Sequence, residues 1–407
     1  MIIVKIAWRN IWRNRLRSWV VIMSIILGIW AGVFMVALSF GMNESRAKSQ
    51  INSFISDMQI HHKEYKVDYK LKYTIPDVQQ IEEQLNKNLK VKAYSKRLLV
   101  KEAMLVSSKI NQGLSIIGVD PEKEKKVTDL HAKLIKGEYF PEIKGKAVLI
   151  GKKLADKLKA DIKSKVIVRY QDVDGNIIQT KFKVVGIFET SNSNFDESSI
   201  YVRNKNLAKL VNLKDQYHEI AVRTTNKIEA KGLEDELQPQ FSGDTKVEYW
   251  GEVSPDLAYA DEMMGQTLYI FMGIIMIALL FGIVNTMLMA VLERKRELGM
   301  LMSIGMNKVK IFLMIVTETI MLAIVGGPLG ILLAYLSVYY FGKTGIDISI
   351  VGEGMKSFGM DTMLYPTIEN QYYPQIAVMV IITAIIAAIF PARKALKLKP
   401  AEAVRSL

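Results

Sequence analysis

Four long stretches without charge are the feature that most constrains this chain. Residues 18–43, 263–292 and 370–392 contain no charged side chain, and residues 311–342 contain only Glu318. A helix needs about 20 apolar residues to cross a bilayer core of roughly 30 Å, and four runs of this length are not expected in the core of a soluble protein. We therefore predict four transmembrane helices over these ranges.

Basic residues gather beside these stretches and predict their orientation. Of a net charge of +13, residues 1–17 carry +5, residues 293–310 carry +3 and residues 393–407 carry +4, whereas residues 343–369 carry −2. Positive loops stay in the cytoplasm, so we expect both termini and the middle segment there, in a bacterial cytoplasmic (inner) membrane. Residues 44–262 and the acidic loop would lie in the periplasm. Because the excess charge flanks the membrane, where anionic lipid attracts it, we expect no nucleic acid partner.

The first 17 residues predict an amphipathic helix on the membrane. Lys5, Arg9, Arg13 and Arg17 recur every four positions, and tryptophans gather on another face of the same helix. A basic stripe beside an aromatic one is typical of a helix in the headgroup layer, so membrane lipid is its expected partner. It is either a simple anchor or an elbow helix that moves with the first span.

Residues 44–262 predict a periplasmic domain of mixed α+β type, with a possible smaller β-rich subdomain at about 140–203. Apolar alternation marks strands at Lys165–Tyr170 and Lys181–Phe188, and the Asp-Gly between them favours a hairpin turn. Further strands are expected at Met58–His62, Leu114–Val119, Ala147–Ile150, Ile200–Val202, Glu219–Arg223 and Lys246–Trp250. Helices are expected at Pro76–Asn86, Gly151–Ala160, Asn204–Leu213 and Lys227–Leu237. The fold class is an α-helical membrane protein with four transmembrane helices and a large extracytoplasmic α+β domain between helices 1 and 2.

No motif for catalysis or metal binding stands out. The sequence has no G-x-x-x-x-G-K-[ST], no H-E-x-x-H, no G-x-S-x-G and no cysteine. His61 and His62 would point to opposite faces of a strand, so we expect them on a solvated surface without a metal. The Lys-rich run at 121–126 predicts a solvated helix face. We therefore expect that this chain is not an enzyme and that it binds no cofactor or metal itself.

Residues 293–310 carry the most informative motif. Charges of both signs on a short amphipathic helix favour a surface that docks a protein. Glu318 then lies about two turns inside the third span, where a carboxylate is costly unless it is paired; we favour a local pair with Lys308 or Lys310 over a separate functional role. The candidate docking residues are Glu293, Arg294, Arg296, Glu297, Gly299, Ser303, Gly305 and Glu318.

The sequence resembles the permease subunits of FtsX-like (type VII) ABC transporters along nearly its whole length. Ala7-Trp8-Arg9-Asn10 precedes the first span, and Glu293 to Gly305 is similar to the family's R-x-R-E-[IL]-G…G coupling segment. Glu318 matches the acidic position that follows, and the tail from Pro391 is similar to P-A-x-x-A…P-x-x-A-L-R, with Val404 in place of Leu. The resemblance implies a second permease, identical or paralogous. It also implies a separate P-loop ATPase dimer that holds ATP and Mg and engages the coupling segment.

Within that family the sequence is similar to the lipoprotein-releasing LolC/LolE branch. Met58-Gln59-Ile60-His61, Ile117–Pro121 and Val184–Phe188 match motifs of its soluble domain. That resemblance implies extraction of lipoproteins from the outer leaflet of the inner membrane and transfer to a periplasmic carrier protein. The alternatives are a mechanotransmission permease for drug or peptide export, a signalling permease that controls a cell-wall hydrolase, and a membrane-anchored binding protein without an ATPase. The coupling segment disfavours the last.

Two further residue sets follow from this resemblance. Flexible methionines and broad aromatics near the outer ends of the first two spans suit varied acyl chains, although ordinary packing of the spans is the favoured alternative. This candidate cavity comprises Met35, Leu38, Met264, Leu268 and Phe271. The hairpin tip is the candidate carrier-docking site, but it lacks stiffening prolines and a plain solvent-exposed turn is favoured. Its residues are Asp172, Asp174, Gly175 and Asn176.

Overall fold

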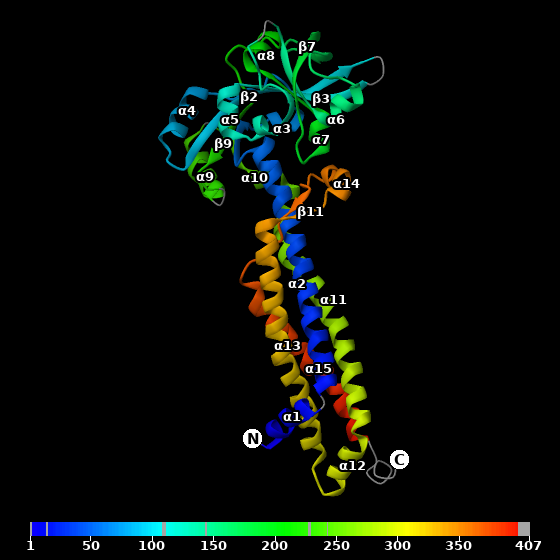
Figure 1. Cartoon of the computed structure of the whole chain (residues 1–407). Helices are drawn as coiled ribbons and strands as arrows, with labels where there is room; N and C mark the ends of the chain where they lie inside the picture. The colour runs from blue at the N-terminus through cyan, green and yellow to red at the C-terminus, as the bar shows by residue number, and fades with distance from the viewer. Residues whose placement is uncertain are drawn as a thin grey trace. The chain divides into compact units, whose positions relative to one another are not determined.

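The computed structural model describes residues 2–13, 15–107, 111–142, 145–226, 229–241 and 243–397. The chain divides into two compact units. The helical unit comprises Met1–Met42, Glu262–Ile346 and Leu364–Leu407, and the domain unit comprises Asn43–Asp261 and Asp347–Met363. Figure 1 labels the elements of both units along the chain.

Four long helices build the helical unit: α2 (Arg15–Gln50), α11 (Pro255–Glu293), α13 (Lys308–Thr344) and α15 (Tyr372–Leu396). All four are long and apolar enough to cross a membrane. They continue beyond the uncharged stretches. The residues after Asn43 explain this for α2, because Glu, Arg, Ala, Lys and Gln are all good helix formers.

Two glycines of α13 set its distance from α2. A Cβ added to Gly326 would lie 3.0 Å from the Cβ of Ile25, and one added to Gly330 would lie 3.0 Å from the Cβ of Ile29. Small residues four apart let two membrane helices approach closely. The contact also fixes the register of these parallel helices, because the carbonyl of Ile22 lies level with Gly326.

Two short helices lie at the same end of this unit. Helix α1 (Ile2–Arg13) packs against α13. It buries Ala7 and Ile11, whereas Trp8 and Trp12 stay about half exposed. Helix α12 (Lys295–Ser303) joins α11 to α13. It is followed by Gly305, whose φ of +92° favours glycine in the turn toward α13.

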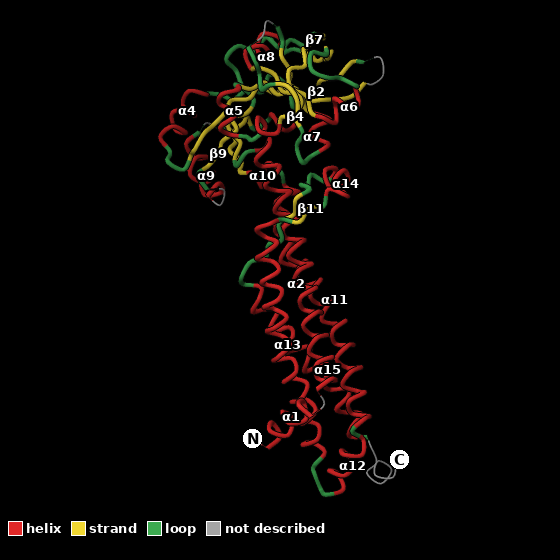
Figure 2. The backbone as a smooth tube through the Cα atoms, viewed as in Figure 1, coloured by secondary structure: helices red, strands yellow, loops and turns green. Residues whose placement is uncertain are grey.

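The domain unit contains one ten-stranded mixed sheet, whose strands are yellow in Figure 2. The strand order is β10-β1-β9-β2-β3-β8-β5-β7-β4, and β6 pairs with β2 and β7. Its strands are β1 (Met58–His62), β2 (Val91–Val106), β3 (Asn111–Val119), β4 (Leu134–Gly137), β5 (Ala147–Gly151), β6 (Lys165–Gln171), β7 (Ile177–Phe188), β8 (Ser199–Arg203), β9 (Glu219–Thr224) and β10 (Thr245–Tyr249). The strands between 140 and 203 continue this sheet and do not form a sheet of their own.

The long strand β2 joins the two halves of the sheet. Its first part, Val91–Arg97, pairs with β9, and its second part, from Leu98 on, pairs with β3. One apolar core lies around β1 and β9, and others lie around β3, β5 and β7. Helices cover these cores: α3 (Tyr65–Asp68), α4 (Val78–Lys87), α5 (Pro121–Val127), α6 (Lys152–Leu158), α7 (Ser193–Ser198), α8 (Asn204–Leu210), α9 (Ala230–Leu237) and α10 (Trp250–Val253).

The segment between α13 and α15 is more ordered than a plain loop. It contains β11 (Ile346–Asp347), α14 (Gly352–Ser357) and β12 (Met363–Leu364), and β11 pairs with β12. Residues 347–363 belong to the domain unit. There the Nζ of Lys356 lies 2.6 Å from Oε1 of Glu189, which also contacts Lys152 at 3.2 Å. The sequence analysis did not foresee this docking, because the partners lie far apart in the chain.

Candidate functional site

The turn formed by the end of α11, α12 and the start of α13 is the candidate functional site. Helix α12 buries Leu298 and Gly299 against the bundle. Arg296 and Met300 on its other side are exposed, and Ile304, the residue directly after the helix, is 85% exposed. Positions four apart share one helix face. The turn therefore presents one basic and two large apolar side chains on a single outward face.

Ion pairs tie this turn to its neighbours. Nη1 of Arg294 lies 3.2 and 3.0 Å from the two carboxylate oxygens of Glu318, and Nε lies 3.2 Å from Oε2 of Glu297. Arg13 of α1 donates to the same oxygen of Glu297. Both Arg294 and Glu318 are largely buried. A planar guanidinium that meets both carboxylate oxygens is the geometry expected of a strong buried pair.

The partner of Glu318 corrects the sequence-based expectation of Lys308 or Lys310. Arg294 reaches it because α12 folds back and places the end of α11 beside α13. Glu318 precedes Gly326 by about two turns. In the register set by Ile22, it therefore lies near the start of α2. The carboxylate sits at one end of the bundle, where pairing is least costly.

Glu297 is engaged within the protein. Burial raises the pKa of this carboxyl, but the hydrogen bonds from Arg13 and Arg294 outweigh that effect and hold its pKa below the usual range. It therefore stays ionised and bridges α1 to the end of α11.

The predicted coupling residues thus separate into two groups. Arg294, Glu297 and Glu318 form the internal network. Arg296 and Ser303 are exposed on α12, although the Ser303 hydroxyl donates to the Gly299 carbonyl at 3.0 Å. The exposed Glu293 and Gly305 flank the helix, and Gly299 is buried within it. The sequence analysis missed Met300 and Ile304; their spacing of four after Arg296 is the signal that could have identified them.

The candidate cavity residues differ in exposure. Met35 and Phe271 are 57% and 42% exposed. Leu38 and Met264 are partly buried. Leu268 is fully buried in the apolar core of the bundle, so in this conformation it packs the helices together and does not line an open wall.

The hairpin tip is more ordered than its composition suggests. The Asp172 carboxylate accepts hydrogen bonds from the backbone N–H groups of Asp174 at 3.0 Å and Asn176 at 2.8 Å. Gly175 has a φ of +85°, which the turn requires. The Asn212 side chain donates to Asp174 at 3.2 Å and holds the tip against the segment after α8. These hydrogen bonds order the tip without proline.

Sequence reasoning also missed a buried charge cluster in the domain. Arg97 lies with Nη2 2.6 Å from Glu124 and Nη1 2.7 Å from Glu219. Glu124 is completely buried, so α5 is not only the solvated face predicted for residues 121–126. His61 is likewise buried, with Nε2 3.1 Å from Glu248, and its predicted place on the surface is wrong.

No metal centre emerges from the part of the chain that the structure describes. Within these residues no group of three or more His, Cys, Asp or Glu side chains could hold an ion. The ion pairs of Arg97 with Glu124 and Glu219 join β2 to α5 and β9.

Two family models match the chain in succession. Residues 18–240 match the MacB-like periplasmic core domain, and residues 269–400 match the FtsX-like permease C-terminal model. Together the matches cover most of the domain unit and most of the four long helices.

The chain is also similar to individual known proteins, at low sequence identity. The lipoprotein-releasing system transmembrane protein LolC of Xylella fastidiosa (strain 9a5c) is 21% identical over 75% of this chain and 76% of that protein. LolC of Neisseria meningitidis is 22% identical over the same shares. The pyoverdine export ATP-binding/permease protein PvdT of Pseudomonas fluorescens is 29% identical over 67% of this chain and 40% of that protein. Among solved structures, the periplasmic region of MacB from Actinobacillus actinomycetemcomitans matches with a TM-score of 0.35 and 13% identity, over 50% of this chain and 94% of that one.

Proposed function

The chain belongs to the FtsX-like permeases of ABC transporters, and from this premise we propose that it couples a separate ATPase to the release of lipoproteins from the inner membrane. In this proposal the ATPase, with its ATP and Mg, lies in the cytoplasm beside both termini of the permease. Lipoproteins leave the outer leaflet and pass to a periplasmic carrier. A second permease, identical or paralogous, completes the transporter.

The exposed face of α12 carries the coupling part of this proposal. An amphipathic helix docks in a partner's groove through apolar anchors spaced three or four residues apart. Met300 and Ile304 have this spacing, and Arg296 lies one turn before them. We infer that a P-loop ATPase dimer binds here and that the network of Arg294, Glu297 and Glu318 passes its movement into α11 and α13.

The similarity to LolC supports lipoproteins as the cargo. Extracting an acyl chain from a bilayer costs about 0.8 kcal/mol per CH₂, so a driven permease is needed for this work. Met35 on α2 and Phe271 on α11 are exposed, and they are the candidate contacts for acyl chains. The ordered hairpin at 172–176 is the candidate contact for a carrier, because a preorganised loop binds at a lower ordering cost.

Export of a small molecule is the second candidate function. It is favoured by the 29% identity to a pyoverdine export permease. In this alternative the ATPase binds the same turn at α12, and neither a lipoprotein nor a carrier is involved.

Reconstitution distinguishes the two functions. The full chain and its cognate ATPase are placed in proteoliposomes with a fluorescent triacylated lipoprotein, and ATP-dependent transfer to soluble carrier is measured. Lipoprotein release predicts transfer that requires ATP. Normal ATP turnover without transfer, together with ATP-driven efflux of a small dye, would instead establish export.

The coupling turn is tested by the double substitution Met300→Glu/Ile304→Glu, because two carboxylates cannot enter an apolar groove without cost. We expect loss of ATPase co-purification while the permease keeps its melting temperature. Ile350→Glu, at a fully exposed position in the domain unit, is the matched control and should retain the ATPase. Wild-type ATPase yield with the double variant would refute docking at α12.

The internal network is tested by charge exchange. Glu297→Lys places a third cation beside Arg13 and Arg294, so we expect uncoupled ATP turnover. Adding Arg13→Glu restores one pair of opposite charges and should recover part of the coupling. Equal coupling in all three proteins would remove Glu297 from the mechanism.

A further inference from the structure

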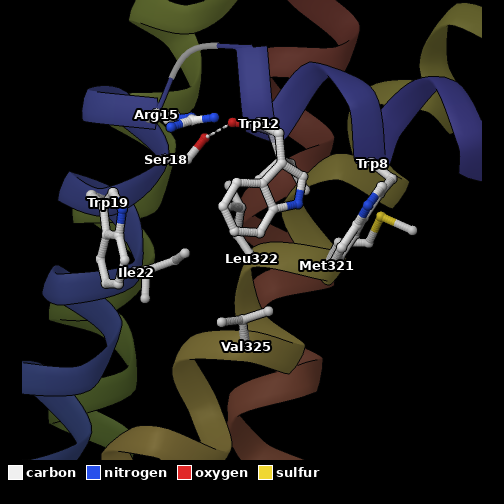
Figure 3. Close-up of a pocket in the computed structure, with 10 residues that line it drawn as sticks. Trp8, Trp12, Arg15, Ser18, Trp19, Ile22, Met321, Leu322 and Val325 are labelled. Carbon is white, nitrogen blue, oxygen red and sulfur yellow. Dashed lines mark hydrogen bonds between the residues drawn. The ribbon is translucent and has the colours of Figure 1, made fainter.

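An apolar hollow lies where α1, α2 and α13 meet (Figure 3). It is lined almost entirely by apolar side chains and is partly open to the surroundings. Most of its wall is formed by Trp8 and Trp12 of α1, Trp19 of α2, and Met321, Leu322 and Val325 of α13.

Helix α1 packs against the bundle through two buried apolar residues. Ala7 and Ile11 are buried, so α1 lies close to α13. The Ser18 hydroxyl donates to the carbonyl of Ile11 at 2.8 Å and ties the start of α2 to α1. Trp8 and Trp12, whose rings meet edge to face with centroids 5.9 Å apart, stand beside the space that remains.

The two ends of the hollow differ in polarity. Arg15 is its one charged lining residue, and Figure 3 shows it at the start of α2, with Val325 at the other end of the hollow. The register that sets Ile22 level with Gly326 places Val325 deeper along the bundle than Arg15. Arg13 pairs with Glu297, whereas Arg15 has no carboxylate partner among the described residues.

The three tryptophans also indicate the surroundings of this surface. Trp8, Trp12 and Trp19 are each about half exposed. Tryptophan concentrates at membrane interfaces, where its ring is in lipid and its N–H reaches polar groups. An apolar slot that deepens into the bundle from a cationic rim matches an amphiphile with an anionic head and an acyl chain.

We propose that this hollow binds one anionic phospholipid of the leaflet on the α12 side. One acyl chain lies against Met321, Leu322 and Val325, and the phosphate is bound by Arg15. A guanidinium binds phosphate oxygens through paired charge-assisted hydrogen bonds, and nearby basic residues enrich anionic lipid at the surface. The exposed Lys5 and Arg9 supply such basic charge on α1. The site would hold a resident lipid whatever cargo the protein moves, so it does not depend on the proposed function.

Native mass spectrometry of the full chain tests this site. Wild-type protein in detergent is titrated with dioleoyl phosphatidylglycerol or dioleoyl phosphatidylcholine, and retained lipids are counted. We expect one phosphatidylglycerol to bind tightly. Arg15→Gln should weaken it about tenfold, the value of one charge-assisted hydrogen bond. Val325→Trp should abolish its binding by filling the slot.

Matched variants separate the site from general effects. Arg9→Gln removes an exposed cation outside the lining, and Ile324→Trp adds the same ring at a neighbouring exposed position of α13; both should bind lipid like the wild type. Should Val325→Trp fold poorly, brominated phosphatidylglycerol gives a second measurement. The brominated lipid should quench the tryptophan fluorescence of the wild type more than that of the Trp19→Phe variant.

Three results would overturn the proposal. Equal lipid retention by Arg15→Gln, Val325→Trp and their controls would remove the site. Equal affinity for phosphatidylcholine would remove the selection for anionic lipid. Loss of a dimer peak in Val325→Trp with unchanged lipid retention would show that a second copy of the chain occupies the hollow.

Discussion

The Arg294–Glu318 pair puts two opposite charges among the apolar side chains where α11, α12 and α13 meet. Glu318 is 3% exposed, and both of its oxygens lie within 3.2 Å of the guanidinium. Removing one member of a buried pair leaves the other without compensation, whereas removing both restores an apolar contact. The pair therefore fixes how α11 and α13 meet, even where it adds little net stability.

A double-mutant cycle tests this pair. We expect Glu318→Leu and Arg294→Met each to destabilise the permease by about 3–5 kcal/mol, the usual cost of breaking a buried pair. Arg294→Met/Glu318→Leu should lose much less, because no charge stays buried. Thermal unfolding in detergent measures all three variants, with Glu353→Gln on exposed α14 as the control. Additive losses in the double variant would show that the two residues act independently.

His218 is a buried neutral side chain that makes the domain sensitive to acid. Its Nδ1 accepts a hydrogen bond from the Leu99 N–H at 3.1 Å, and Nε2 lies 3.0 Å from the Leu71 carbonyl. Burial lowers the pKa of His218 from 6.5 to about 4, although the Leu71 contact and Glu219 oppose the shift. Between these values the unfolded chain binds a proton that the folded domain does not.

We therefore expect stability to be fully present above about pH 6.5 and to fall as the pH drops toward 4, by at most about 1.4 kcal/mol per pH unit from this group. In His218→Gln the amide can make both hydrogen bonds without titrating, so the decline should be shallower. Melting temperatures at pH 7, 6 and 5 measure it. Burial raises the pKa values of Asp196 and Glu234 to about 7, so these two carboxyls add stability as the pH falls. Their effect is the same in wild type and in His218→Gln. If the melting temperatures of wild type and His218→Gln fall in parallel as the pH drops, His218 is not the cause of the acid sensitivity.

Close packing of α13 on α2 depends on glycine at two positions of one helix. A Cβ at Gly326 or Gly330 would meet α2 at 3.0 Å, whereas one at Gly327 would have its nearest neighbour, Val380, at 3.6 Å. At the first distance the neighbouring side chain must move by a few tenths of an ångström, whereas the second distance is ordinary contact. Gly326, Gly327 and Gly330 lie within five residues of α13, yet only Gly327 has room for a larger side chain.

Alanine substitutions test this difference. Gly326→Ala/Gly330→Ala should lower stability by about 1–3 kcal/mol, the usual cost of overpacking. Gly327→Ala should be neutral or raise it, because alanine has the higher helix propensity by about 1 kcal/mol. Melting temperatures in one detergent compare them. The idea fails if the double variant is as stable as Gly327→Ala.

Sequence patterns predicted the helices and strands better than they predicted which strands and side chains pair with one another. Alternation at Met58–His62 predicted a strand that the structure shows with the same bounds, and the Asp-Gly turn marked the β6–β7 hairpin. The long strand β2 escaped prediction, because each half is buried differently by its own neighbours. The carboxylate of Glu318 stood out within an apolar run, but its pairing with Arg294 required the fold of α12.

At the scale of the whole molecule, the chain passes between the two units four times. The crossings follow Met42, Asp261, Ile346 and Met363. The short segment 347–363 is held in the domain unit by the contacts of Glu189 with Lys152 and Lys356. Helices α2 and α11 cross the boundary between the units, α13 ends two residues before it, and residues 364–371 connect it to α15.

Glu189→Gln should loosen this segment. Its two lysine contacts are partly exposed and each is worth about 0.2–1 kcal/mol, so we expect trypsin to cleave after Lys356 about two- to fivefold faster. Glu353→Gln, on the exposed side of α14, should leave the rate unchanged. Fragment masses over time measure the cut. Identical rates in wild type and Glu189→Gln would mean that other contacts hold the segment.

The contact between Arg13 and Glu297 has a consequence for regulation. It joins α1, which borders the lipid hollow, to α12, whose other face is the proposed ATPase contact. Thermodynamic linkage is reciprocal: if nucleotide-driven docking changes the lipid affinity by some factor, lipid changes the docking affinity by the same factor. Membrane composition would then act as an allosteric effector of ATP turnover, without a dedicated sensor domain.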